Sequence, residues 1–174
     1  GMYMNPESDE TTHFSIADKF GNVISNTYTI NSAFGSGVTI KGTGILMNNE
    51  MDDFSGQPGV PNQFGLLGGI ANEVEPGKRP LSSMTPTIVF DNDEPFLAIG
   101  SPGGSRIITA VLQIILNVID FEQSLDEATD SKRVHHQWYP DDIDIEETYN
   151  QINELIDLGY KIDIIDTATC TQSI

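Results

Sequence analysis

Residues 11–31 constrain the N-terminal region to an antiparallel hairpin, because apolar and polar residues alternate on both sides of a short turn. The apolar positions are Phe14, Ile16, Ile24, Tyr28 and Ile30. A tight turn at Phe20-Gly21 predicts that Thr12 pairs with Thr29 and Thr11 with Ile30. Strict alternation then directs the Thr11 and Thr29 hydroxyls to opposite faces, so their meeting would need a bulge or a twisted strand end.

The rest of the chain predicts an α+β domain over residues 11–174, preceded by a polar leader at residues 1–10. We expect a short buried strand at 44–49, a second hairpin of 87–90 and 96–99, a largely buried helix at 106–120, a short helix starting with a capping box at Ser124, a helix at 144–158 and strands at 162–165 and near the C-terminal end. Residues 50–86 are dense in glycine and proline and too long for a passive connection, which favours a functional loop.

The size and the charge of the chain limit the classes of function that it can have. The 174 residues suffice for one domain with a core, and 8 basic against 26 acidic side chains give a net charge of −18. Such a surface disfavours direct binding to nucleic acid or to anionic membranes. The longest apolar run is too short and too interrupted to span a bilayer, and the single cysteine, Cys170, excludes an internal disulfide.

Two stretches could carry acyl-transfer chemistry. Thr11 is a possible nucleophile if the peptide bond before it is cut, because its own α-amine would then be a base with a pKa near neutrality. In isolation, however, Thr11 equally fits the first residue of a strand. The turn at residues 100–105 has three readings: an oxyanion hole made by the amides of Gly103 and Gly104, a phosphate cradle, or a structural turn.

Two other polar clusters can be interpreted either as binding sites or as ordinary structural features. The acidic run with Glu50 and Asp53 suits an ammonium group or simply faces solvent. Ser82 and Ser83 suit a carboxylate or form an ordinary turn. The three histidines lack standard ligand spacing, so we expect no metal and no cofactor.

Five runs occur in one order along the chain: Thr-Thr-His-Phe-Ser at 11–15, Asn-Asn-Glu-Met-Asp-Asp-Phe at 48–54, Pro-Gly-Val-Pro-Asn at 58–62, Lys-Arg-Pro-Leu-Ser-Ser-Met-Thr-Pro-Thr-Ile at 78–88 and Gly-Ser-Pro-Gly-Gly-Ser-Arg-Ile at 100–107. Together they resemble the small, C-terminal subunit of γ-glutamyltranspeptidases, with bacterial members closest. The likeness covers nearly the whole chain from Thr11 onward.

The resemblance implies a fold and a set of residue roles. The family is an N-terminal-nucleophile (Ntn) hydrolase with a four-layer αββα sandwich, of which this chain would form the small-subunit part. The precursor cuts itself before Thr11, which then accepts the γ-glutamyl group of glutathione-like donors as an ester and passes it to water or to amino acids. The implied roles are positioning of Thr11 by Thr29, an oxyanion hole at Gly103 and Gly104, binding of the substrate α-amino end by Asn31, Glu50 and Asp53, and binding of its α-carboxylate by Ser82 and Ser83.

The resemblance also implies a partner. A large, N-terminal subunit of the same precursor would complete the sandwich, and without it exposed core surface could lead to self-association. Residues precede Thr11 here, so its α-amine lies in a peptide bond and the isolated fragment is expected to be inactive. The family further implies a periplasmic or secreted protein. The alternatives are a related acylase that cleaves glutaryl-type β-lactam side chains, a non-catalytic γ-glutamyl-binding relative, or a structural domain.

Overall fold

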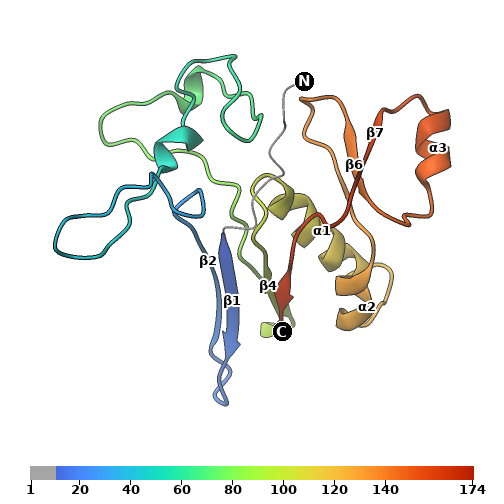
Figure 1. Cartoon of the computed structure of the whole chain (residues 1–174). Coiled ribbons are helices and arrows are strands. Elements are labelled where there is room, and N and C mark those ends of the chain that lie inside the picture. Colours follow the sequence, from blue (N-terminus) through green and yellow to red (C-terminus); the bar gives the residue numbers. More distant parts are fainter. Residues whose placement is uncertain (1–10) are drawn as a thin grey trace.

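The structure, a computed structural model, describes residues 11–174, and the predicted leader at residues 1–10 lies outside the described residues. A β-hairpin, a three-stranded antiparallel sheet and a helix stack as successive layers, and a second small sheet lies beyond the helix (Figure 1). This arrangement confirms the α+β class. It contains two β layers and one helical layer, which fits part of the four-layer sandwich that the family resemblance implies.

The N-terminal hairpin consists of β1 (Thr12–Ala17) and β2 (Val23–Tyr28). Its predicted register was wrong by one residue, because Thr12 pairs with Tyr28. The side chain of Asp18 accepts the backbone N–H groups of Phe20 and Asn22, which fixes a five-residue turn in place of the tight one. Continued by one pair, the observed register sets Thr11 opposite Thr29 on one face, so the two hydroxyls need no bulge to approach each other.

The central sheet contains β3 (Thr87–Asp91), β4 (Glu94–Gly100) and β8 (Gln172–Ser173) in the order β3-β4-β8. The predicted second hairpin is confirmed, and Asn92 and Asp93 in its two-residue turn have φ angles of 48° and 67°. Both values match a type I′ turn, whose twist suits a hairpin.

Two helices cover one face of this sheet. They are α1 (Arg106–Ile119) and α2 (Leu125–Asp130), and α2 begins with the predicted capping box at Ser124. The hydrophobic core lies between β4 and these helices and consists of Leu97, Ile99, Ile107, Val111, Ile114 and Ala128. The expectation of a largely buried α1 was wrong for one face of the helix, because Ile108, Leu112, Leu116 and Ile119 are exposed there.

A second sheet follows in the order β5 (Val134–His135), β6 (Ile143–Glu146) and β7 (Ile162–Ile165), with α3 (Ile152–Asp157) joining β6 to β7. The strand predicted at 162–165 is confirmed, but the helix predicted at 144–158 is wrong at its start. Ile143 and Ile145 alternate with Asp144, and they are buried by parallel pairing with β7. Long-range pairing therefore overrides the helical spacing there. The strand predicted at 44–49 is also wrong, because only an isolated bridge between Thr39 and Leu46 forms and the side chains of Ile45 and Met47 are exposed.

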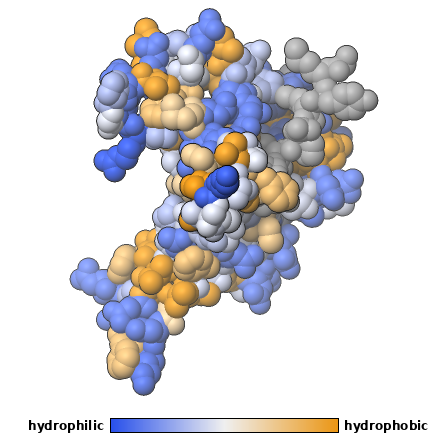
Figure 2. All heavy atoms as spheres, turned by 60° about the vertical axis from the view of Figure 1, so that its left-hand side comes forward, coloured by the Kyte–Doolittle hydropathy of each residue, from blue (hydrophilic) through white to orange (hydrophobic). Residues whose placement is uncertain are grey.

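The hairpin turns its polar face inward. His13 is buried, and the Ser25 hydroxyl donates to the backbone carbonyl of Ile99 in β4 at 3.0 Å. The outward face is apolar and exposed, and it carries Phe14, Ile16, Ile24 and Tyr28. Figure 2 shows hydrophobic side chains gathered over this lower part of the molecule. We name these four residues the hairpin apolar face. The described part of the chain, residues 11–174, contains no helix of sufficient length and hydrophobicity to cross a membrane.

Candidate active site

A cavity of about 290 Å³ lies where the end of the hairpin, the glycine- and proline-rich loop and the start of α1 meet. Most of the predicted site residues line it, although they come from separate stretches of the chain: Thr11, Thr29, Asn31, Asp53, Ser82, Ser83 and Gly104. Glu50 and Gly103 are not among the lining residues. Glu50 interacts with the lining residue Asp53, and Gly103 directly precedes the lining residue Gly104 in the chain. The structure thus brings the predicted residues together, and their individual roles stay predictions.

The hairpin end is fixed by its own hydrogen bonds. The Asn31 backbone N–H donates to the Thr29 hydroxyl at 2.9 Å, and the Asn31 side-chain amide donates to the carbonyl of Asn49 at 3.2 Å. Asn31 is buried and has a φ angle of 75°, which asparagine tolerates better than most residues. These contacts hold the Thr29 side chain beside the cavity and tie the hairpin to the acidic segment that follows Asn49.

Two acidic side chains share one short turn. The segment η1 (Glu50–Asp53) is a 3-10 helix, in which side chains three residues apart lie one above the other. Burial, followed by a hydrogen bond to Asp53 and the charge of Asp53, raises the pKa of Glu50 to about 7. Burial also raises the pKa of Asp53. One buried oxygen of Glu50, Oε1, has no hydrogen-bond partner among residues 11–174.

This carboxyl pair is suited to a cation. Two half-buried acids that repel each other keep a proton more readily than isolated acids do, and a bound ammonium group would favour both in their charged forms. The residues thus provide a negative subsite at the cavity, with Asp53 on its wall.

Ser82 and Ser83 line the cavity from a later part of the same loop. The Ser82 hydroxyl accepts the backbone N–H of Met84 at 3.1 Å, and the Leu81 N–H donates to the Asn72 side chain at 3.0 Å. Asn72 in turn donates to the carbonyl of Asp53 at 2.7 Å, so one side chain links the serine segment to the acidic segment. The sequence interpretation of residues 50–86 did not include Asn72, although the residue lies within the predicted functional loop.

The turn between β4 and α1 requires glycine at two positions. Gly103 and Gly104 have φ angles of 122° and 55°, and a Cβ atom on Gly103 would lie 2.8 Å from the Thr169 hydroxyl oxygen. The turn leads directly into the N-terminal end of α1, where the aligned peptide dipoles favour negative charge. An oxyanion placed at this turn would therefore be stabilised, and Gly104 lies on the cavity wall.

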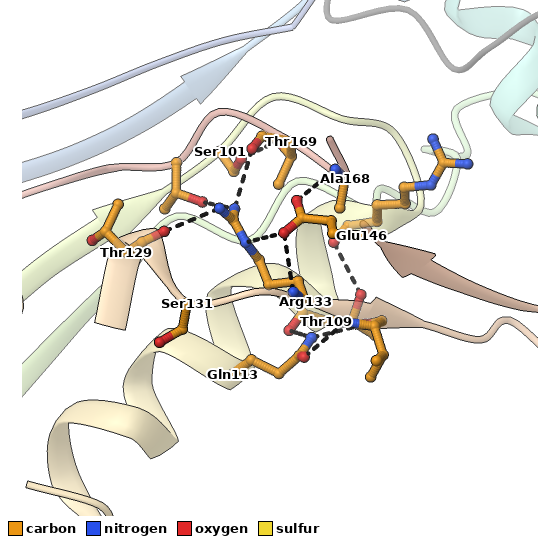
Figure 3. A network of polar contacts seen from close by, with 12 residues as sticks. Ser101, Thr109, Gln113, Thr129, Ser131, Arg133, Glu146, Ala168 and Thr169 are labelled. Carbon is orange, nitrogen blue, oxygen red and sulfur yellow. Dashed lines mark hydrogen bonds and ion pairs between the residues drawn. The ribbon is translucent and has the colours of Figure 1, made fainter. Parts of the chain in front are cut away.

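A buried polar network supports the back of this turn (Figure 3). The hydroxyls of Ser101 and Thr169 are hydrogen-bonded to each other, and the Thr169 hydroxyl donates to the carbonyl of Pro102. The Arg133 guanidinium donates to the Thr169 carbonyl at 3.1 Å. Glu146 accepts the backbone N–H groups of Arg133 at 3.0 Å and of Ala168 at 2.7 Å.

Sequence reasoning missed this network. Arg133 and Glu146 are both buried and form an ion pair, with 3.7 Å between Nε and Oε2. The only signal in the sequence was an acidic residue directly after the apolar positions 143 and 145. Gln137 was missed as well, although its side-chain carbonyl accepts the hydroxyl of Ser105, a cavity-lining residue, at 2.6 Å.

The three histidines bond to different partners. His13 contacts Thr27 and Ser15, and His135 contacts Thr109 and Gln137, whereas His136 pairs with Asp141. Within residues 11–174, no group of three His, Cys, Asp or Glu side chains is arranged to hold a metal ion.

Comparison with known proteins identifies the family. The γ-glutamyltranspeptidase family model matches residues 1–174. The chain is 51% identical over 170 residues to the glutathione hydrolase proenzyme of Escherichia coli K12, covering 97% of this chain and 29% of that protein. It also superimposes on a T380A mutant of Helicobacter pylori γ-glutamyltranspeptidase with a TM-score of 0.90 and 51% identity, covering 94% of this chain and 89% of the solved one.

A more distant match is a cephalosporin acylase from Bacillus halodurans, with a TM-score of 0.78 and 28% identity, which covers 93% of this chain and 29% of the acylase chain. The chain thus spans less than a third of the Escherichia coli proenzyme, and the matched part contains the predicted nucleophile, the acidic pair, the serine pair and the glycine turn. On the family match, the sequence identity and the superposition together, this chain belongs to the γ-glutamyltranspeptidase family.

Proposed function

We propose that this chain is the nucleophile-bearing, C-terminal part of an enzyme that transfers or hydrolyses γ-glutamyl groups, with glutathione-like compounds as donors. The observation that carries the proposal is the cavity, because a threonine, an acidic residue, two serines and a helix-initiating glycine turn meet around one space of about 290 Å³. Each chemical group of a γ-glutamyl donor has a matching side chain or amide there.

Donor recognition follows from charge and hydrogen-bonding capacity. The α-ammonium group of the donor would bind at Glu50 and Asp53, whose carboxyls lose their shared proton when the cation enters. The side-chain carbonyl of Asn31 would accept from the same ammonium. The α-carboxylate would accept hydrogen bonds from the Ser82 and Ser83 segment, whose hydroxyls are uncharged donors.

The chemical step would use Thr11 as the nucleophile. The peptide bond between Glu10 and Thr11 is first hydrolysed, which frees the Thr11 α-amine to take the proton of the Thr11 hydroxyl. The hydroxyl oxygen then attacks the γ-carbonyl carbon, and the amides of Gly103 and Gly104 would stabilise the oxyanion. The C–N bond breaks, the amine leaves with the proton, and a γ-glutamyl ester on Thr11 remains. Water or an amino group attacks this ester, takes the acyl group and returns the proton to Thr11.

Thr29 would position the nucleophile. The hairpin register, continued by one pair, would set Thr29 opposite Thr11, and the Asn31 N–H donates to the Thr29 hydroxyl. A hydroxyl held in this way restricts the rotation of the Thr11 side chain, which supports attack in one direction.

The proposal includes a partner and a location. The remaining part of the precursor would act as the large subunit and complete the site and the missing layer, and the proposal places the mature protein in the periplasm or outside the cell. The coverage of about 29% of the Escherichia coli proenzyme supports the first point. Family resemblance supports the second, and cell fractionation tests it.

The acylase alternative is disfavoured by the acidic pair. A glutaryl side chain has no α-ammonium group, so two half-buried carboxyls beside its binding site would serve no purpose and would repel its carboxylate.

The deciding experiment expresses the full-length precursor and follows its maturation and its turnover of γ-glutamyl-p-nitroanilide. We expect cleavage that leaves Thr11 as the first residue of the smaller piece, and release of p-nitroaniline by the mature protein. Thr11→Ala should abolish both, whereas Thr12→Ala on the neighbouring position should retain them. A smaller piece beginning at another residue, or turnover by Thr11→Ala, would refute the proposal.

A further inference from the structure

His13 lies between the candidate nucleophile strand and the strand that leads to the glycine turn. Its ring is buried on the inward face of β1, where Nδ1 and the Thr27 hydroxyl lie 2.6 Å apart, and Nε2 and the Ser15 hydroxyl 3.0 Å apart. Both ring nitrogens are thus bonded within the hairpin, which leaves the ring little rotational freedom.

The other side of the ring contacts the last residue of β4. A Cβ atom placed on Gly100 would lie 2.2 Å from Cε1 and 2.3 Å from Nδ1 of His13, closer than any side chain tolerates. Gly100 has no unusual φ angle, so neither a turn nor backbone strain requires a glycine at this position. The close approach of the imidazole is the feature that excludes a side chain at residue 100.

We propose that His13 is a positioning residue that acts as a spacer between Thr11 and the glycine turn by fixing the hairpin against the backbone of Gly100. Thr11 is two residues before His13 on the same face of the hairpin, and Gly103 is three residues after Gly100. The ring therefore lies close to two segments that reach the cavity. One of them contains Thr11, and the other leads from Gly100 to Gly104. This inference rests on the proposed acyl-transfer function.

The surroundings of the ring support a structural contact in place of a proton-transfer role. Burial lowers the pKa of His13, so the imidazole is neutral near pH 7 and both of its hydrogen bonds join uncharged groups. Among the cavity-lining residues Thr11 is the nearest in sequence, and the ring is already occupied by Thr27 and Ser15. His13 thus acts through the position of the backbone.

The test is a double-mutant cycle in the full-length precursor, with kcat measured per active site by titration of mature enzyme. Gly100→Ala should lower kcat for γ-glutamyl-p-nitroanilide by roughly 10²-fold, since misplacement by about 1 Å costs that much, while KM changes by less than about twofold. His13→Ala should lower kcat by about tenfold. The double variant should recover about tenfold over Gly100→Ala, because the smaller side chain leaves room for the added methyl group.

Two further variants guard against a failure to fold. His13→Asn retains a polar group towards Thr27 but loses the ring that contacts Gly100, and it should mature with a lowered kcat and an unchanged KM. Gly69→Ala is the matched glycine control, because a Cβ there meets nothing within 4 Å, and it should behave as wild type.

The outcomes distinguish the spacer role of His13 from the proposed acyl-transfer function. If the wild type turns over the substrate, two results would overturn the spacer role and leave the proposed function intact. One is additive losses of kcat in the double-mutant cycle, and the other is an unchanged kcat per active site in His13→Asn. A loss of active-site titre alone, at constant kcat per site, would also overturn it, since that result indicates only a folding role. Absence of wild-type turnover would overturn both.

Discussion

The proton on Glu50 connects pH to donor binding. Its pKa of about 7 means that a neutral carboxyl predominates below pH 7, whereas an ammonium ligand requires the carboxylate. Binding then releases a proton, so affinity for L-glutamate as a competitive inhibitor should fall up to about tenfold per pH unit below 7. We expect the inhibition constant to rise between pH 8 and 5.5. In Glu50→Gln the rise should be much flatter, and an equal slope in both proteins would contradict the assignment.

Gly103 is the residue at which a single methyl group should stop turnover. Alanine there would combine an unfavourable φ of 122° with contacts of 2.8 Å and 2.9 Å to Oγ1 and Cβ of Thr169. The amide would be displaced, and removal of one oxyanion donor typically lowers kcat by about 10²- to 10³-fold. Gly77→Ala is the control, because φ is 76° there but no atom lies within 4 Å. Comparable kcat losses in both variants, measured with γ-glutamyl-p-nitroanilide, would assign the effect to backbone strain alone.

The ion pair of Arg133 and Glu146 joins β5, β6 and the segment before β8 behind the glycine turn. The exposed fractions of these residues are 8% and 2%, so Arg133→Met would leave a buried carboxylate without its cation. Loss of one partner of such a pair costs about 3–5 kcal/mol, which should lower the apparent Tm of the mature protein by roughly 10 °C. Lys161→Met removes an exposed pair with Asp142 and should change Tm by less than about 3 °C. Equal shifts in thermal melts of both variants would rule out a buried, structural ion pair.

Local sequence patterns predicted the elements whose partners are close along the chain. The hairpin at β3 and β4 and the capping box at Ser124 depend on neighbouring residues, and both were found as expected. The start of the helix predicted at 144–158 failed, because residues 143–146 instead pair with β7, almost twenty residues away. The hairpin register failed by one residue, because Asp18 bonds two N–H groups of the turn and lengthens it.

The sequence predicted which residues form the candidate site but not how the fold brings them together. Motif resemblance supplied the nine residues, whereas alternation alone placed Thr11 and Thr29 on opposite faces. Their arrangement at one cavity depends on the corrected register and on loop contacts such as that of Asn72 with Asp53. Arg133 and Gln137 gave no local signal, and Glu146 gave only its position after two apolar residues, because their function in the fold is to bond to segments distant in sequence.

The molecule as a whole leaves apolar surface at both outer layers. The hairpin apolar face is exposed on one side of the stack, and Ile108, Leu112, Leu116 and Ile119 of α1 are exposed on another. Full burial of an exposed side chain of this kind is worth about 1.5–3 kcal/mol, and these side chains are roughly half exposed, so covering both faces would contribute an amount comparable to the stability of one domain. A net charge of −18 favours solubility but does not bury these faces.

Residues 11–174 produced alone should therefore self-associate and bind a hydrophobic dye, whereas the same chain matured from the full-length precursor should do neither. Ile16→Asp and Ile24→Asp introduce charge on the hairpin apolar face, so they should raise the monomer fraction of the isolated chain in light scattering. In the full-length precursor the same changes should impair assembly, because the charge would then be buried. Gln151→Glu is the control, since it adds the same charge at an exposed residue before α3, away from the hairpin apolar face. An isolated chain that stays monomeric and binds no dye would show that these faces need no cover.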